Sequence, residues 1–340
     1  MNLPATARPA TAHAAPLLNA ARLLRAAPLL LALLLLAVFP AVGEKFYVDL
    51  AVKIMILAIF ALSLELLVGQ TGLVSFGHAA FFGIAAYVAA LLTPKSEAAS
   101  LWLVLPASIG AAAAYALAVG ALSLRTRGVY FIMITLAFAQ MAYYVFHDTP
   151  VGGGSDGIYL YFRPDASILG WRPFDLDAGH GFYYAVLACL VGTFGVLAIM
   201  LRSRYGHALA GIRVNEQRMR AAGFPTYAYK LGAFVLAAAF AGLAGFLHAL
   251  KDGYVNPEIL SWHQSGAVLL MVILGGIGHL RGAILGAFAF TMLQELFQWQ
   301  AIFGAFAKHW QLMLGLAIIG FVAALPRGLI GLADRLRRRR

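Results

Sequence analysis

The segment from Phe46 to Gly69, FYVDLAVKIMILAIFALSLELLVG, decides the fold class. Its charged residues are Asp49, Lys53 and Glu65, and nearly everything between them is aliphatic or aromatic. About 20 consecutive apolar residues are enough for a helix to cross the hydrocarbon core of a bilayer. The segment is therefore long enough and apolar enough to be a transmembrane helix.

The rest of the chain has the same character. Its 340 residues are 62% hydrophobic and 11% charged, and the mean hydropathy is +0.83. Soluble domains carry about 25% charged residues, so a soluble enzyme is excluded. Backbone polar groups must be paired inside hydrocarbon, which predicts a polytopic helical membrane protein. The single cysteine, Cys189, lies in an apolar run and excludes a disulfide framework.

We predict an all-α fold with ten transmembrane or re-entrant helices, one for each apolar run. The third and the eighth are interrupted by glycines, and the eighth is also short, so either could be a re-entrant or broken helix. The predicted helices are Ala27 to Val42, Phe46 to Gly69, Leu73 to Leu92, Leu101 to Leu124, Gly128 to Phe146, Gly181 to Leu201, Leu231 to Leu250, Ser265 to Gly278, Gly282 to Phe297 and Trp310 to Leu325.

The net charge of +11 reports orientation rather than nucleic-acid binding. When the N-terminus is placed in the cytoplasm, most of the 25 lysines and arginines fall on the cytoplasmic side, as the positive-inside rule requires. This predicts a cytoplasmic N-terminal segment at 1–26, a transmembrane domain at 27–325 and a basic cytoplasmic tail at 326–340. Residues 1–43 could instead be a cleaved signal peptide, but the region before Leu29 is long for that, which favours a retained helix.

Two connections are long, and they face opposite sides. The external loop, 147–180, contains GGGSDG at Gly152 to Gly157, which has the spacing of a dinucleotide-binding glycine motif. No strand is predicted before it, so a turn that opens a short surface helix is the better interpretation. The cytoplasmic loop, 202–230, predicts an amphipathic helix that ends at Gly223 and Pro225. That helix could lie on lipid headgroups, cap the bundle or dock on a cytoplasmic partner, and composition leaves these alternatives nearly even.

The chain contains no nucleotide-binding loop, no metal-ligand spacing and no nucleophile motif, so we expect no catalytic residue, metal or cofactor of its own. Charged groups in the bilayer are costly, which makes polar residues within spans informative. Either they line a translocation path or they form hydrogen bonds between helices. The two interpretations are nearly even for Glu65, whereas Glu295 lies near a span end and favours the second. The candidates for lining a path are Glu65, Gln70, Ser75, His78 and Gln140.

Several segments together resemble the LivM-type permeases of branched-chain amino-acid ABC importers. The resemblance covers roughly residues 45–325, and the matching segments occur in the same order as in the family. Taken together, these segments are specific for the family. They are GQTGLVSFGHAAFFGIAAY (Gly69 to Tyr87), TRGVYFIMITLAFAQM (Thr126 to Met141), GGSDGI (Gly153 to Ile158), NEQRMRAAGFPTYAYKLGAFVLAAAFAGLAGFLHAL (Asn215 to Leu250) and GYVNPEILSWHQSGAVLLMVILGGIGHLRGAILGAF (Gly253 to Phe288).

The resemblance implies an inner-membrane subunit that pairs with a second, related permease and contacts lipid but no nucleic acid. It also implies two cytoplasmic ATPase subunits that bind the ATP, and a periplasmic binding protein that delivers the substrate. By this resemblance the cytoplasmic loop corresponds to the coupling loop. Docking of its helix on a cytoplasmic partner is then favoured over the two other interpretations, a helix on lipid headgroups or a cap of the bundle. Its candidate residues are Arg213, Glu216, Arg220, Gly223 and Lys230, while the pattern is looser at Arg218 and Met219.

Alternative functions remain at this stage. Permeases for urea or short-chain amides are closely related, although the block from Asn256 to Gly266 looks more like the amino-acid branch. An ion-coupled secondary transporter would need intramembrane ligands, for which Asp49, Glu65 and Glu295 are available. A structural membrane subunit without transport would have no need of the amphipathic loop.

Overall fold

The computed structural model describes residues 31–41, 43–167 and 180–331. The chain divides into residues 1–48 and 49–340, and each part is described by itself. The described residues of the first part form the apolar helix Leu31–Ala41 and the first turn of α2 (Lys45–Glu65). The predicted segment 1–26, the end of the tail beyond residue 331 and the middle of the external loop lie outside the described residues.

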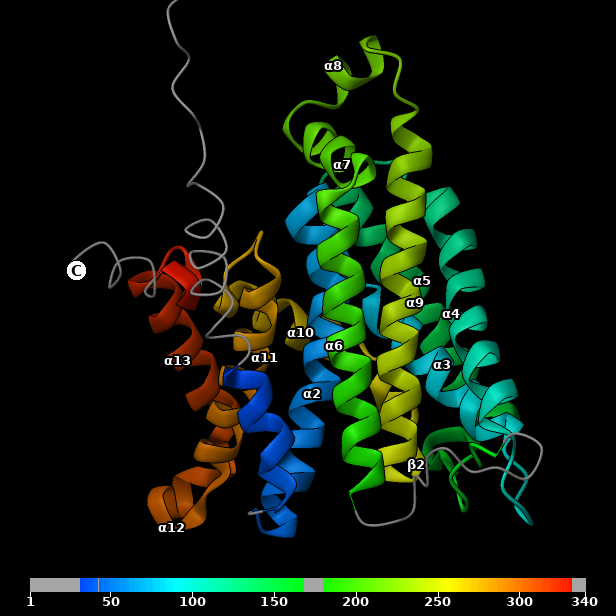
Figure 1. The fold of residues 1–340 in the computed structure, drawn as a ribbon, viewed down its shortest axis with the longest axis vertical. Helices are drawn as coiled ribbons and strands as arrows, with labels where there is room; N and C mark the ends of the chain where they lie inside the picture. The colour runs from blue at the N-terminus through cyan, green and yellow to red at the C-terminus, as the bar shows by residue number, and fades with distance from the viewer. Residues whose placement is uncertain (1–30, 42, 168–179, 332–340) are drawn as a thin grey trace, which may run out of the picture. The chain divides into compact units, whose positions relative to one another are not determined.

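Residues 49–340 form an almost entirely helical unit (Figure 1). The strands β1 (Ile158–Tyr159) and β2 (Tyr254–Val255) pair antiparallel, with Ile158 opposite Val255. After α2 come η1 (a π-helix, Leu66–Thr71), α3 (His78–Leu92), α4 (Leu101–Ser123), α5 (Val129–Asp148), η2 (Pro150–Gly152), η3 (Gly154–Asp156), α6 (Gly181–Arg202), α7 (Arg204–Val214), α8 (Glu216–Ala221), α9 (Thr226–Asp252), η4 (Pro257–Leu260), α10 (Trp262–Gly275), α11 (Leu280–Gln298), α12 (Gln300–Phe303), η5 (Gly304–His309) and α13 (Trp310–Ala324).

The all-α class is confirmed, and every predicted span contains a helix among its described residues. Within the described residues, seven helical segments are long and apolar enough to cross a membrane: Lys45–Thr71, Leu101–Ser123, Val129–Asp148, Gly181–Arg202, Thr226–Asp252, Leu280–Gln298 and Gln300–Gly331. Three apolar helices are shorter: Leu31–Ala41, His78–Leu92 and Trp262–Gly275. The chain is therefore a multi-pass membrane protein.

The third and eighth predicted spans are interrupted where glycine permits it. Gly72 has φ +74° at the end of η1, and the backbone then stays non-helical until α3 begins at His78. Helix α10 stops at Gly276, whose φ is +114°. At 1.5 Å per residue, the 15 residues of α3 span about 22 Å, which is less than a hydrocarbon core of about 30 Å. Both elements are broken spans.

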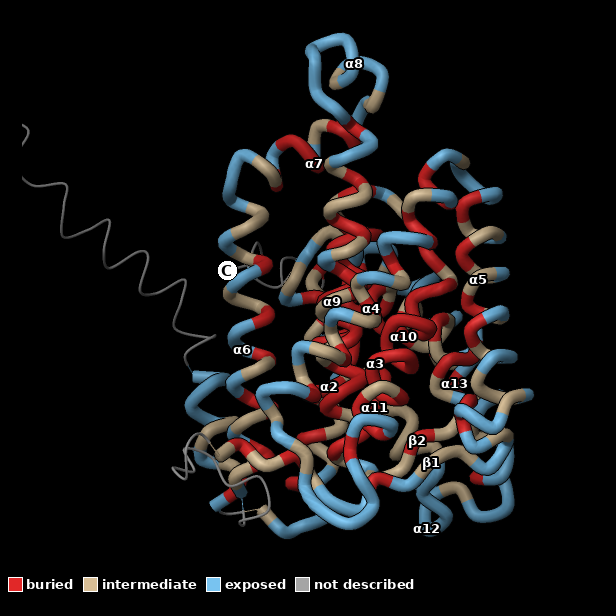
Figure 2. The backbone as a smooth tube through the Cα atoms, turned by 90° about the vertical axis from the view of Figure 1, so that its right-hand side faces the viewer, coloured by how far each residue is buried: buried red, intermediate tan, exposed pale blue. Residues whose placement is uncertain are grey.

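Helix α9 lies at the centre of the packing because its surface is made of small residues. It packs against both α3 and α4, and Figure 2 shows the buried backbone concentrated on these elements and α2. A Cβ on Gly245 would overlap the carbonyl of Phe82 on α3, and one on Gly242 would lie 2.8 Å from Ala112 Cβ on α4. Small residues that let helix backbones approach closely are typical of membrane bundles.

The outer helices carry their large apolar side chains outward. A soluble protein would bury such a surface, whereas lipid solvates it. The exposed residues include Leu103 and Leu117 on α4, Met133 on α5, Val196 and Ile199 on α6, and Leu316 and Ile319 on α13.

Candidate functional site

The predicted coupling loop forms two helices rather than one. Asn215 interrupts the helix between α7 and α8 with an extended backbone (φ −156°, ψ 98°), and its side chain accepts the Arg218 N–H at 2.9 Å. Asparagine favours such a cap over a helix interior, because its amide competes for backbone hydrogen bonds. The loop is helical, as predicted, but it forms two short helices instead of a single one. Helices α7 and α8 lie at one end of the unit and α12 lies at the other (Figure 1).

Lys230 lies on α9 rather than in the loop. The loop prediction ran to this residue, but α9 begins at Thr226, directly after Pro225. Proline is well tolerated next to a helix start because its φ is preset and it needs no N–H partner there. The side chain of Lys230 is only 7% exposed, so the start of α9 supplies a buried cation against which α8 packs.

Glu216 gathers most of the coupling-loop candidates. Its Oε1 accepts hydrogen bonds from Arg220 Nη2 at 2.6 Å, Lys230 Nζ at 2.9 Å and Thr226 Oγ1 at 3.1 Å. Burial acts to raise the pKa of Glu216, but the hydrogen bond and charge of Lys230, with help from Thr226 and Arg220, hold it below its usual value. Gly223, with φ +86°, forms the turn that brings α8 back to α9. Glu216 therefore fixes α8 to the transmembrane helix.

Arg213, the remaining coupling-loop candidate, connects α7 to the membrane-spanning part. Helix α7 packs against η1, and Arg213 Nη1 donates a hydrogen bond to the carbonyl of Gly69 within η1. A π-helix has a wider turn than an α-helix, and such turns occur frequently at functional sites. Arg213 thus links α7 directly to η1.

The carboxylate of Glu65 lies next to Gly69, at the same contact. The residue is fully buried, and its Oε1 accepts the backbone N–H of Gly278 at 2.7 Å. Gly278 has φ +92° and belongs to the turn between α10 and α11. A Cβ on Gly69 would overlap the Glu65 carboxylate. We call Glu65, Gly69, Arg213 and Gly278 the junction, because they join α7, η1 and the α10–α11 turn.

The five path candidates are not brought together. His78 Nε2 lies 2.7 Å from Ser63 Oγ, and Ser75 Oγ accepts the Gly77 N–H at 3.2 Å; both candidates are fully buried. Gln70 on η1 and Gln140 on α5 are partly exposed and lie on separate elements. The hydrogen bond that Glu65 accepts from the Gly278 N–H supports the interhelical interpretation for Glu65. The assignment of these residues to a path stays a prediction.

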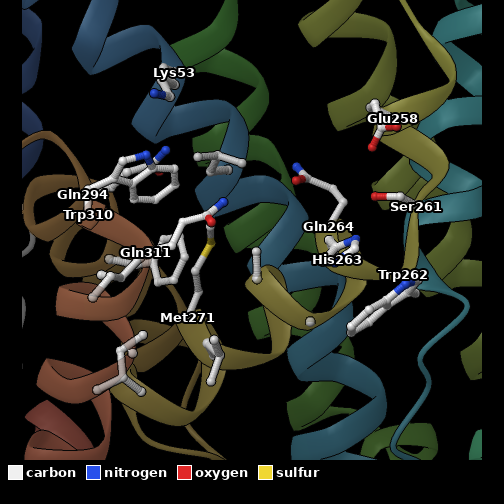
Figure 3. A pocket seen from close by; sticks show the side chains of 18 of the residues that line it. Lys53, Glu258, Ser261, Trp262, His263, Gln264, Met271, Gln294, Trp310 and Gln311 are labelled. Atoms are coloured by element: carbon white, nitrogen blue, oxygen red, sulfur yellow. The ribbon is translucent and has the colours of Figure 1, made fainter. Parts of the chain in front are cut away.

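A cavity of about 600 Å³ lies between α2, α10, α11 and α13. Figure 3 shows Lys53, Gln294, Trp310 and Gln311 on one side, with Glu258, Ser261, Trp262, His263 and Gln264 on the other. Its apolar wall includes Ile56, Leu270, Met271, Phe290, Leu314 and Ile318. Lys53 precedes Glu65 by twelve residues on α2, a distance of about 18 Å at 1.5 Å per residue. The cavity therefore lies towards the end of α2 that is away from the junction.

Lys53, which lines the cavity, forms an ion pair with Glu295, which is not among the lining residues. Lys53 Nζ on α2 is 2.9 Å from Glu295 Oε1 on α11, and the two side chains are 36% and 30% exposed. The sequence analysis placed both residues in spans but did not pair them, because they are far apart along the chain. It also missed the polar ends of α10, α11 and α13. A signal was present, since glutamines and histidines recur at the ends of these three runs, as at Gln264, Gln294 and Gln311.

Among the described residues, no three His, Cys, Asp or Glu side chains are grouped as ligands of a metal ion would be. Several polar groups of the described unit instead form hydrogen bonds between helices, and others line the cavity. The cavity is large enough for a small molecule, and α7 is in direct contact with the membrane-spanning part.

Comparison with known proteins identifies relatives of this chain. The chain is 33% identical over 319 residues to the high-affinity branched-chain amino acid transport system permease protein LivM of Escherichia coli, which covers 88% of this chain and 73% of the relative. It is 32% identical to LivM of Salmonella typhimurium with the same coverage. No solved structure matches. The profile of the family described as "Branched-chain amino acid transport system / permease component" matches residues 46–323. The chain therefore belongs to the branched-chain amino acid transport system permease family.

Proposed function

We propose that this chain is the membrane-spanning permease subunit of an ATP-driven importer that carries leucine, isoleucine or valine across the bacterial inner membrane. The observation that carries the proposal is the contact of Arg213 with Gly69. It joins the helical loop directly to η1, the π-helical end of the membrane-spanning segment that begins with α2. A subunit without a nucleotide site can still perform active transport if a partner favours one of its conformations through differential contacts. Helices α7 and α8 are the surface on which such contacts would act.

The partners follow from this role. Two cytoplasmic ATPase subunits would bind the ATP and dock on α7 and α8. A second, related permease would form the other half of the path, and a periplasmic binding protein would deliver the amino acid. Both termini would then be cytoplasmic, as the distribution of arginines favours. The relatives' names support the substrate, since both are branched-chain amino acid permeases.

An ion-coupled secondary transporter is less well supported. It would need intramembrane carboxylates that can exchange an ion. Glu65 is instead bonded to the Gly278 backbone, and Glu295 is paired with Lys53. These contacts give both carboxylates a structural or substrate-positioning role.

The test is leucine uptake into proteoliposomes that contain the chain together with candidate ATPase, permease and binding-protein subunits from the same source. Uptake should require ATP on the ATPase side and the binding protein on the other, and it should persist when ion gradients are collapsed. Urea should not compete. Uptake by the chain alone under an ion gradient, or failure to associate with any ATPase, would refute the proposal.

A further inference from the structure

A groove of about 690 Å³ lies between α4, α6 and α9, next to the start of α7. It is lined by Leu117 of α4, Met200 of α6, Tyr205 of α7 and residues between Ala228 and Leu236 on α9. All of the lining residues are apolar apart from the hydroxyl of Tyr205, which donates to the carbonyl of Tyr229 at 2.8 Å. None of the lining residues is buried. The groove is therefore an uncovered apolar surface on the membrane-spanning unit.

The length of the groove matches the hydrocarbon of one leaflet. From Ala228 to Leu236 along α9 it extends about 12 Å at 1.5 Å per residue, and half of a hydrocarbon core of about 30 Å is about 15 Å. Leu117 and Leu236 in the lining are 51% and 38% exposed, so the groove is open to the surroundings of the unit, which are lipid along a membrane-spanning helix. An acyl chain can therefore lie in the groove without leaving the bilayer.

Two arginines lie at the end of the groove that is next to α7. Arg202 ends α6 and Arg204 begins α7, and the lining residues Met200 and Tyr205 flank them along the chain. Both arginines are exposed, and neither forms an ion pair with another described residue. Glu216, the carboxylate of this loop, is instead paired with cations of α8 and α9. This end of the groove therefore carries two positive charges that no described carboxylate compensates.

An apolar groove with a basic end is complementary to an anionic phospholipid. Guanidinium groups bind phosphate through paired, charge-assisted hydrogen bonds, and basic sites between transmembrane helices bind anionic lipid head groups. We propose that the groove binds one phospholipid of net negative charge, with its phosphate at Arg202 and Arg204 and one acyl chain along α9. The lipid then joins α6 to α9 at the point where the membrane-spanning unit meets α7. This inference goes beyond the proposed function, since it concerns a lipid and not the transported molecule.

The test titrates the purified full chain with dioleoyl phosphatidylglycerol and measures the bound lipid by native mass spectrometry. Dioleoyl phosphatidylcholine has the same acyl chains and a phosphate but no net charge. The wild type should therefore bind phosphatidylglycerol at least tenfold more tightly than phosphatidylcholine, equal to about 1.4 kcal/mol. Arg202→Gln/Arg204→Gln should abolish this preference. Arg127→Gln/Arg218→Gln is the matched control, because it removes the same charge from exposed positions that do not line the groove; it should keep the preference.

A second pair of variants tests the apolar part of the groove. Ala228 is a small, exposed residue of the lining, so Ala228→Trp should be tolerated and should fill the groove near its basic end. Binding of phosphatidylglycerol should weaken at least tenfold, because the acyl chain loses its place. Ala118 on α4 is also exposed but does not line the groove, so Ala118→Trp should leave the affinity unchanged.

These measurements need no transport, so the inference and the proposed function can fail separately. Equal affinity of the wild type for the two lipids would overturn the inference, as would an unchanged preference in Arg202→Gln/Arg204→Gln or unchanged binding by Ala228→Trp. The same titration on the assembled transporter decides between a lipid and a protein neighbour. If the lipid site that depends on Arg202 and Arg204 persists after assembly, the lipid occupies the groove. If that site is lost on assembly, another subunit covers the groove and the inference is wrong.

Discussion

Glu216→Gln should loosen α8 from α9 without unfolding the membrane-spanning unit. The substitution keeps the shape of the side chain but removes the charge that Lys230 Nζ contacts at 2.9 Å. Lys230 is 7% exposed and Arg220 is 50% exposed. Losing the contact with Lys230 should therefore destabilise α8 more than losing the contact with Arg220.

The magnitude follows from these exposures. Breaking a fully buried ion pair costs about 3–5 kcal/mol, but the glutamine amide can still accept one hydrogen bond, and a hydrogen bond contributes about 1 kcal/mol net. The Arg220 pair adds less than about 1 kcal/mol, because exposed pairs are worth little. The expected loss is about 2–3 kcal/mol, or roughly 30-fold to 150-fold in the local opening equilibrium at 1.4 kcal/mol per factor of ten.

Hydrogen exchange of the α8 amides in the assembled transporter measures this opening. Exchange at Glu216–Ala221 should accelerate by that factor, while the amides of α3 and α9 keep their protection. A double-mutant cycle with Lys230→Met then isolates the pair. A coupling energy below about 0.5 kcal/mol, within the additivity found for independent sites, would refute the reasoning.

Further predictions concern packing, the junction and pH. Gly245→Ala should lower the melting temperature, because its Cβ overlaps the α3 backbone and overpacking costs about 1–3 kcal/mol; Gly192→Ala, with open space around it, should not. Gly69→Ala should displace the Glu65 carboxylate and reduce leucine uptake more than it reduces membrane insertion; equal losses would contradict the junction's role. The pKa of Glu216 is held below its ordinary 4.5, so its contribution to stability is complete above pH 4.5 and is lost as the pH falls through the lower folded value. Protection of α8, corrected for intrinsic exchange rates, should thus be constant from pH 8 to about 5 and fall only in stronger acid; a fall near pH 6 would contradict this.

The fold class could be predicted from the sequence because lipid imposes a strong local rule: an apolar run must be a helix. The third and eighth spans were predicted to be broken or re-entrant from the glycines in them, and the structure has positive φ at Gly72, directly before the third span, and at Gly276 within the eighth. The start of α9 was misplaced by a few residues because the apolar run begins only after Lys230, whereas the helix already begins at Thr226. Lys230 can be buried in the helix because the carboxylate of Glu216 compensates its charge.

The contacts of the candidate site could not be predicted from the sequence, because they join segments that are far apart along the chain. Arg213 and Gly69 are 144 positions apart, and Lys53 and Glu295 are 242 apart. The sequence analysis singled out Arg213, Glu65 and Glu295 individually, since charge near a membrane is informative by itself. Which of them meet depends on how the helices pack, and no spacing along one chain encodes that.

The most direct test of the central claim is the number of leucine molecules transported per ATP hydrolysed in proteoliposomes, compared between the wild type and Arg213→Gln. The account predicts that Arg213→Gln still assembles and hydrolyses ATP but transports at least tenfold less leucine per ATP, because α7 no longer holds the Gly69 carbonyl of η1. Arg127→Gln, an exposed arginine in the connection between α4 and α5, should keep the wild-type ratio. A wild-type ratio in Arg213→Gln would contradict the claim that movement of the loop reaches the membrane-spanning unit through this contact.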